Sequence, residues 1–216
     1  MKQFWLIRHG QSTSNAGLPT TDQETTPLTD LGRAQAAGVA AFFVEPPDLI
    51  VTSPYQRTAE TAAPARARWP QVAHEVWPVQ EFTYLNPALY HNRTQEERWP
   101  HVLEYWQQAE PRYRAGDGAE SFMDMLGRAA ALERRLCETT AERILVFTHG
   151  IFMRGFLWHW LVGEGGGREN MPAFRAFLQA TRTPNGCMLA GVVTAEGEVL
   201  LGRVQTSHLM PDLGSE

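Results

Sequence analysis

The chain has 216 residues, 43% hydrophobic and 20% charged, which is typical of a folded globular protein. Its net charge of −5 gives no electrostatic basis for binding nucleic acid. No apolar run reaches membrane-spanning length, and the two cysteines show neither a disulfide framework nor zinc-site spacing. We therefore expect a cytoplasmic protein with one domain over residues 1–216 and with no membrane or nucleic-acid partner.

The apolar run at residues 4–7 predicts a buried strand near the N-terminus. Arg8, His9 and Gly10 follow it directly, at the strand end where α/β folds present functional groups. A guanidinium beside an imidazole is suited to binding and attacking a phosphate. The guanidinium offers a planar fork of hydrogen-bond donors, and the imidazole can act as a donor, base or nucleophile. The alternative is that Arg8 pairs with a carboxylate and His9 is an ordinary buried histidine.

A helix, a strand and a second helix are expected next. Thr29 is a suitable N-cap for a helix that runs to about residue 42, and residues 48–52 predict a second buried strand. Residues 53–56 resemble a helix start, with Ser53 as N-cap, a proline at the first position and a capping box. Arg57 would then lie in the first turn, where free backbone N–H groups favour a nearby anion. Ser53 has two interpretations, as a cap only or as part of a site.

The extended pattern at residues 72–81 predicts a strand that ends at Glu81. An aromatic-rich insertion is expected next, at about residues 82–118. A capping box at residues 94–97 opens a helix in it, and Ser121 can cap the long helix that follows. The insertion could form one wall of a pocket, or its aromatics could make a small core of their own. Some of its basic residues could bind a second anionic group of a ligand, and these are Arg93, Arg98, Arg112 and Arg114.

The third apolar strand, residues 143–148, ends in His149 and Gly150, as the first strand ends in His9 and Gly10. Helices at about residues 151–161 and 172–180 and a hairpin at residues 187–204 follow. Strands that alternate with helices indicate an α/β fold. We expect a three-layer sandwich with a mostly parallel central sheet, helices on both faces and the insertion above the strand ends.

Three strand ends that each deliver a cationic or imidazole group resemble the histidine phosphatase superfamily, the phosphoglycerate mutase-like fold. The matching residues occur in order along nearly the whole chain: Arg8-His9-Gly10 with Ser12 and Asn15, Ser53 with Arg57 and Thr58, Glu81, and His149-Gly150. The resemblance favours the phosphatase branch, because the chain has no clear counterpart of the extra basic segments of the longer mutases.

The resemblance implies a catalytic role for His9, which as a neutral nucleophile would form a phosphohistidine. Arg8, Arg57 and His149 would clamp the phosphoryl oxygens, while Asn15 and the Gly150 N–H would add donors; the histidines show no zinc-site spacing. No metal or cofactor is required for this chemistry.

Glu81 is the expected proton donor to the leaving oxygen, and its carboxylate would then activate water to hydrolyse the phosphohistidine. Its surroundings fit the family pattern only loosely, so Glu75 and Glu120 remain rivals. Glu120 stands before Ser121 at a helix start, where a carboxylate can also serve simply to complement the helix dipole.

The predicted function is a metal-independent phosphomonoesterase of the histidine acid type, acting on a small phosphorylated molecule. One alternative is a phosphoglycerate mutase, which would return the phosphoryl group to its substrate. Another is a non-catalytic phosphate-binding module, although such a module would not need a nucleophile. The sequence assigns neither a particular substrate nor an oligomeric state.

Overall fold

A six-stranded sheet forms the centre of the computed structural model, which describes residues 1–20, 22–163 and 167–209. The strands lie in the order β3-β2-β4-β1-β5-β6. Their bounds are β1 (Lys2–Arg8), β2 (Leu49–Thr52), β3 (Ala73–Val76), β4 (Arg143–Thr148), β5 (Met188–Val193) and β6 (Val199–Gln205). The helices are α1 (Asp30–Phe42), α2 (Gln56–Arg68), α3 (Gln95–Gln108), α4 (Phe122–Glu138), α5 (Gly150–Val162) and α6 (Met171–Ala180), with a 3₁₀ turn, η1 (Pro87–Leu89).

The predicted mostly parallel sheet is confirmed. β3, β2, β4 and β1 run parallel, and the β5–β6 hairpin is added antiparallel to β1. Arg8 is in register with Thr148, and Thr52 with Phe147. The carboxyl ends of β1, β2 and β4 therefore meet at one edge of the sheet, which is where α/β folds place their sites.

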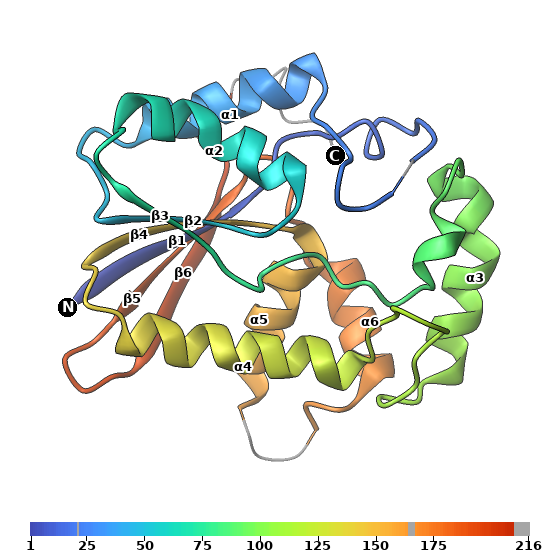
Figure 1. Ribbon diagram of the computed structural model, residues 1–216. Helices are drawn as coiled ribbons and strands as arrows, with labels where there is room; N and C mark the ends of the chain where they lie inside the picture. The colour runs from blue at the N-terminus through green and yellow to red at the C-terminus, as the bar shows by residue number, and fades with distance from the viewer. Residues whose placement is uncertain (21, 164–166, 210–216) are drawn as a thin grey trace.

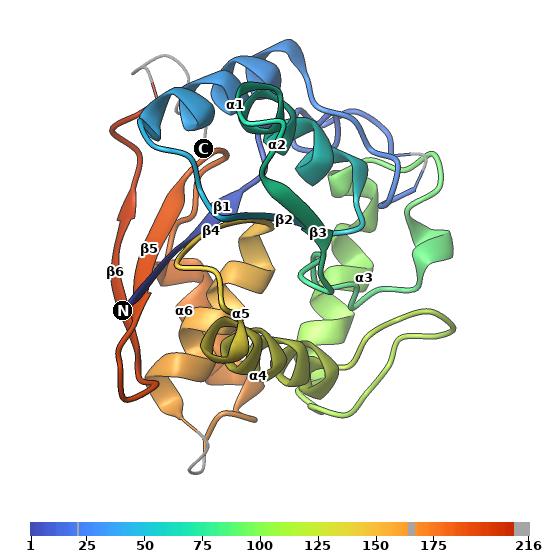
Figure 2. The same ribbon diagram turned by 60° about the vertical axis from the view of Figure 1, so that its left-hand side comes forward.

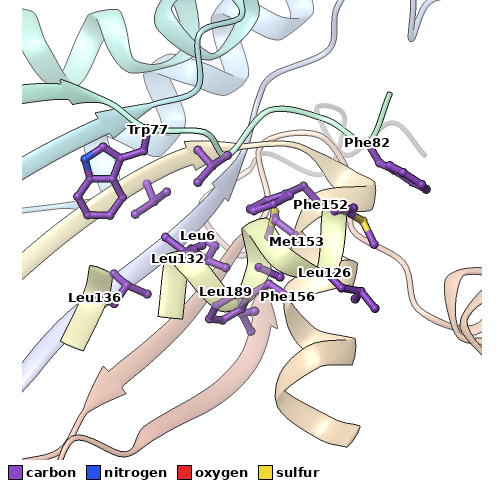
Figure 3. Close-up of a cluster of buried hydrophobic side chains, with 14 of the residues drawn as sticks. Leu6, Trp77, Phe82, Leu126, Leu132, Leu136, Phe152, Met153, Phe156 and Leu189 are labelled. Atoms are coloured by element: carbon purple, nitrogen blue, oxygen red, sulfur yellow. The ribbon is translucent and has the colours of Figure 1, made fainter. Parts of the chain in front are cut away.

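Helices cover both faces of the sheet, as expected from the continuous apolar runs in its central strands. In β1 the side chains alternate, so Phe4 and Leu6 join the core under α4 and α5, while Ile7 joins the core under α1 and α2. Figures 1 and 2 show these two helical layers on opposite sides of the strands. Figure 3 shows the larger core, where Leu6 and Leu189 of the sheet meet Leu132 of α4 and Phe156 of α5.

The start of α2 differs from the sequence prediction. The helix begins at Gln56, and its N-cap is Tyr55 without a side-chain cap, rather than Ser53. Ser53 is 1% exposed, and its Oγ lies 2.8 Å from His149 Nε2. The hydroxyl therefore links the neighbouring strand end to the start of α2, where it also accepts from the Tyr55 N–H and contacts the Thr58 hydroxyl.

Glu81 does not end a strand, contrary to the prediction. β3 stops at Val76, five residues earlier. Trp77 turns into the core at 2% exposure, and Pro78 has no N–H to donate to a sheet ladder. Glu81 is instead carried by irregular chain towards the start of α5.

Residues 82–118, here called the wall segment, lie beyond the carboxyl ends of the parallel strands, with α3 farthest from the sheet (Figure 1). The predicted capping box of Thr94 and Glu97 is present at the start of α3. The aromatics do not form a separate core, because Tyr105 and Trp106 pack in one continuous cluster with the core under the sheet. In the described part of the chain, no helix combines the length and the apolarity needed to span a membrane.

Candidate active site

A cavity of about 340 Å³ lies between the strand ends and the wall segment. It is lined by these predicted site residues: Arg8, His9, Asn15, Arg57, Glu81 and Gly150. The remaining predicted residue, His149, is fully buried behind the lining, with its ring 5.0 Å from the ring of His9. The structure thus brings all the predicted residues to one place, six on the cavity surface and one beneath it.

His9 is held by hydrogen bonds on both sides of its ring. Its Nδ1 lies 2.7 Å from the carbonyl oxygen of Gly10, which can only accept, so Nδ1 carries the proton. Its Nε2 accepts from Arg57 Nε at 3.1 Å and so carries the lone pair. Burial, and then the charges of Arg57 and Arg8, hold the pKa of His9 well below its usual range. The ring is therefore neutral at neutral pH, with a nucleophilic nitrogen at the cavity.

The backbone of His9 is fixed as firmly as its ring. Its N–H donates to Thr148 at the end of β4, and its carbonyl accepts from the N–H of Gly186 and from Asn185 Nδ2. These bonds join β1 to the neighbouring elements on both sides. The ring can therefore move little relative to the sheet.

Two guanidiniums flank His9. Arg57, in the first turn of α2, is 7% exposed and stacks 4.8 Å above the Tyr55 ring. Burial lowers the pKa of Arg57 to about 10, so it remains charged at neutral pH. Arg8 donates to the carbonyl of Thr183 and packs on the first turn of α5. A Cβ at Gly150 would lie 3.1 Å from Arg8 Nε, so glycine at this position leaves room for the guanidinium.

His149 is the N-cap of α5, and Ser53 Oγ contacts its Nε2. Its Nδ1 is buried with no hydrogen-bond partner among the residues that the structure describes. Burial and then the charge of Arg57 hold the pKa of His149 well below its usual range. Asn15 adds a further donor, because Ser12 and Asn185 engage its Oδ1 and leave the amide NH₂ for a ligand.

Glu81 supplies the one carboxylate of the described cavity lining. It accepts from the backbone N–H groups of Ile151 and Phe152 at 3.1 and 2.9 Å, which anchors it at the N-terminus of α5. The rivals lie elsewhere: Glu120 forms a two-point ion pair with Arg128, and Glu75 binds Arg135 and the indole of Trp77. Neither rival lines the cavity.

Several lining or supporting residues were not found from the sequence. Arg154 lies one turn after Gly150 on α5, lines the cavity, and donates to the carbonyls of Gly150 and Leu178. Its position four residues after Gly150, one turn along the predicted helix, could have indicated that it lies on the same side of the helix as the site. Asn185 supports both His9 and Asn15, but it lies in a turn 170 residues from Asn15, and only the folded chain brings them together.

Comparison with known proteins identifies the family and the fold. A family model described as histidine phosphatase superfamily, branch 1, matches residues 4–181. A glucosyl-3-phosphoglycerate phosphatase of Mycolicibacterium vanbaalenii is 40% identical over 63 residues, which is 29% of this chain and 28% of that protein.

Two solved structures share the fold. An α-ribazole phosphatase from Shigella flexneri has a TM-score of 0.72 at 22% identity, covering 95% of this chain and 96% of that one. A phosphoserine phosphatase from Entamoeba histolytica, in complex with 3-phosphoglyceric acid, has a TM-score of 0.73 at 21% identity, covering 97% of this chain and all of that one. These structures show the fold, and the family match, which extends over most of the chain, shows that the protein belongs to the histidine phosphatase superfamily, branch 1.

Proposed function

We propose that this protein is a phosphomonoesterase of the histidine acid type, which hydrolyses a phosphorylated molecule through a phosphohistidine on His9 without a metal ion. The observation that carries the proposal is the state of His9, a neutral ring with its Nε2 lone pair at the cavity and its Nδ1 proton bound to Gly10. A phosphate-binding site has no use for such a nitrogen, since a protonated ring would bind the anion better.

In the first step, His9 Nε2 attacks phosphorus in line and the bond from phosphorus to the ester oxygen breaks. The Arg57 Nε–H group, which donates a hydrogen bond to His9 Nε2 in the free enzyme, then donates to a phosphoryl oxygen instead and leaves the Nε2 lone pair free to attack. Arg8 and the Asn15 amide bind the other oxygens, and the charge of the guanidiniums stabilises the phosphoryl group in the transition state. When His149 Nε2 accepts from the Ser53 hydroxyl, the His149 proton is on Nδ1, and in this mechanism Nδ1 donates to a phosphoryl oxygen.

Glu81 takes both proton-transfer roles in this mechanism. Its carboxylic acid gives a proton to the leaving oxygen, and the resulting carboxylate then accepts a proton from water. The water oxygen bonds to phosphorus as the bond from His9 Nε2 to phosphorus breaks, which restores the neutral imidazole and releases inorganic phosphate. Its position at the start of α5, on the cavity surface, supports this role over Glu75 and Glu120.

Hydrolysis, rather than transfer back to the substrate, is favoured by the related proteins, because three of them are named as an α-ribazole phosphatase, a phosphoserine phosphatase and a glucosyl-3-phosphoglycerate phosphatase. The test is an assay of the purified protein, with a chelator present, against p-nitrophenyl phosphate, ethyl phosphate and 3-phosphoglycerate. Release of inorganic phosphate is expected. Isomerisation of 3-phosphoglycerate without release would indicate a mutase, and binding of phosphate without either reaction would indicate a binding module.

A further inference from the structure

Helix α3 presents one face to the cavity. The lining residues on this helix are Gln95, Arg98, Trp99 and Val102, which follow the spacing of one helical face. This face meets the cavity from the side away from the sheet (Figure 1), so in the proposed mechanism it would lie nearer the leaving group than the phosphate. What these side chains bind therefore decides which alcohol the phosphate is attached to.

Arg98 is the unusual member of this face. The residue is 5% exposed, its Nη1 donates to the carbonyl of Arg93 at 2.6 Å, and its guanidinium stacks 4.6 Å above the Tyr90 ring. In the described part of the chain it forms no ion pair with a carboxylate. The adjacent Glu97 uses its carboxylate in the capping box with Thr94.

A buried guanidinium without a counter-ion is costly, because burial removes its water and no carboxylate compensates for the loss. Burial also lowers the pKa of Arg98, which reports the same loss of solvation. By contrast, the half-buried Arg128 is paired with the carboxylate of Glu120. Arg98 is thus held in place by an aromatic ring and a carbonyl, and no carboxylate among the described residues neutralises its charge.

The cavity lining as a whole carries more positive than negative charge. The described lining holds four guanidiniums, from Arg8, Arg57, Arg98 and Arg154, but one carboxylate, from Glu81. A phosphate dianion bound near His9 offsets only part of this positive charge. Of the four guanidiniums, Arg98 alone lies on α3, whereas the others come from the strand-end side of the cavity.

We infer that Arg98 binds a second anionic group on the leaving-group side of the substrate. This inference rests on the proposed function, and it narrows the substrate class to phosphomonoesters whose alcohol carries a carboxylate or another phosphate. Stacking on Tyr90 holds the guanidinium ready, so little ordering is needed when the anion arrives. Trp99 and Val102 offer apolar contacts beside it for the carbon chain of the same alcohol.

The first test compares matched inhibitors that the enzyme does not hydrolyse. Phosphonoacetate carries a carboxylate where ethylphosphonate carries a methyl group, and a bisphosphonate of similar length carries a second phosphonate. Calorimetry of the wild-type protein should show at least about tenfold tighter binding of one or both doubly anionic compounds, since a charge-assisted pair is worth about tenfold to a hundredfold. The compound that binds more tightly identifies the anion as carboxylate or phosphate.

The second test uses Arg98→Met, which keeps the aliphatic stem and removes the charge. The preference for phosphoglycolate over ethyl phosphate, as a ratio of kcat/KM values, should fall by about tenfold to a hundredfold. Arg112→Met, at an exposed arginine of the wall segment outside the cavity lining, should keep the wild-type ratio. A thermal unfolding curve checks that Arg98→Met folds, and Arg98→Lys, with its charge retained, should lie between wild type and Arg98→Met.

Equal affinity of the wild type for all three inhibitors would overturn the inference, whether or not the variants fold. An unchanged substrate ratio in a folded Arg98→Met protein would overturn it as well. Failure of the proposed function has a different outcome, in which no phosphate is released from any ester, p-nitrophenyl phosphate included, while the inhibitor comparison can still be read.

Discussion

The two sides of the cavity are built in different ways. On one side, which we call the floor, His9, Arg8 and His149 sit at the ends of paired strands, and the backbone of His9 is bonded to both neighbouring elements. On the other side, the wall segment consists of irregular chain, η1 and α3, and none of its residues lies in the sheet. The floor is therefore positioned by the whole fold, and the wall by a layer that lies outside the sheet.

This difference separates two tasks. Phosphoryl chemistry depends on atoms held within tenths of an ångström, which hydrogen bonds along adjacent strands can provide. In the mechanism that we propose, recognition of the leaving group would depend on side chains of one helical face, and these can vary without disturbing the strands. Variants of the floor should therefore change the rate for every ester, whereas variants of the wall should change the order of preference among esters.

The largest effect is expected for His9→Ala on the floor, compared with Trp99→Ala on the wall. Loss of the nucleophile should lower kcat for p-nitrophenyl phosphate by at least about 10⁴-fold, whereas Trp99→Ala should cost a few-fold. Steady-state assays give both numbers, and circular dichroism shows whether each variant is folded. Comparable losses in the two variants would break the division into floor and wall.

Glu81→Gln should come next. An alkoxide needs a proton in order to leave and a nitrophenolate does not, so phosphoenzyme formation should fall about a hundredfold to ten-thousandfold for an alkyl phosphate and much less for p-nitrophenyl phosphate. Single-turnover measurements isolate this step. Glu120→Gln serves as the control, because Glu120 is paired with Arg128 outside the cavity lining. A larger loss in the control would move the acid to Glu120.

Ser53→Ala should have a smaller effect. It removes the hydroxyl that contacts His149 Nε2, and the loss of one hydrogen bond predicts about a threefold to tenfold decrease in kcat and in affinity for inorganic phosphate. Ser121→Ala is the matched control, since Ser121 is also buried but caps α4, and it should lower stability by about 1 kcal/mol instead. If Ser53→Ala lowered only stability, its hydroxyl would have no role in positioning His149.

The smallest predicted effect concerns stability and pH. The pKa values of His9 and His149 are depressed in the folded protein, so the unfolded chain binds more protons below about pH 6.5 and the free energy of unfolding falls as pH decreases from 7 to 5. Urea unfolding at pH 7, 6 and 5 should show this decrease. His149→Asn should reduce it, and His91→Asn, at an exposed histidine of the wall, provides the comparison. An unaltered pH dependence in His149→Asn would show that the buried ring does not supply it.

The floor could be predicted from the sequence to a large extent. Apolar runs followed at once by His9 or His149 indicate strand ends, and parallel strands bring such ends to one edge of a sheet. The predicted strand before Glu81 is longer than the observed one, because an extended sequence pattern does not distinguish a hydrogen-bonded strand from irregular extended chain. The two interpretations of Ser53 could not be separated from the sequence, since a local hydrogen-bond pattern carries no information about a partner 96 residues away.

The wall was less predictable. Capping residues located the start of α3 correctly, but which face of that helix meets the cavity depends on tertiary packing. Arg98 was therefore one of four candidate arginines in the sequence. Only the folded chain distinguishes them: Arg98 lines the cavity, whereas Arg114 pairs with Asp124. The hydrogen bond from Asn185 to the His9 carbonyl could not be predicted from the sequence, because the two residues meet only when the chain returns to the end of β1.

The most direct test of the central claim is to trap the phosphoenzyme. Wild-type protein mixed with a labelled phosphomonoester and quenched within one turnover should carry an acid-labile, base-stable phosphoryl group on His9, formed at least as fast as kcat. His9→Ala should carry none. Turnover without any such label in the wild type, or a label that persists in His9→Ala, would contradict the account.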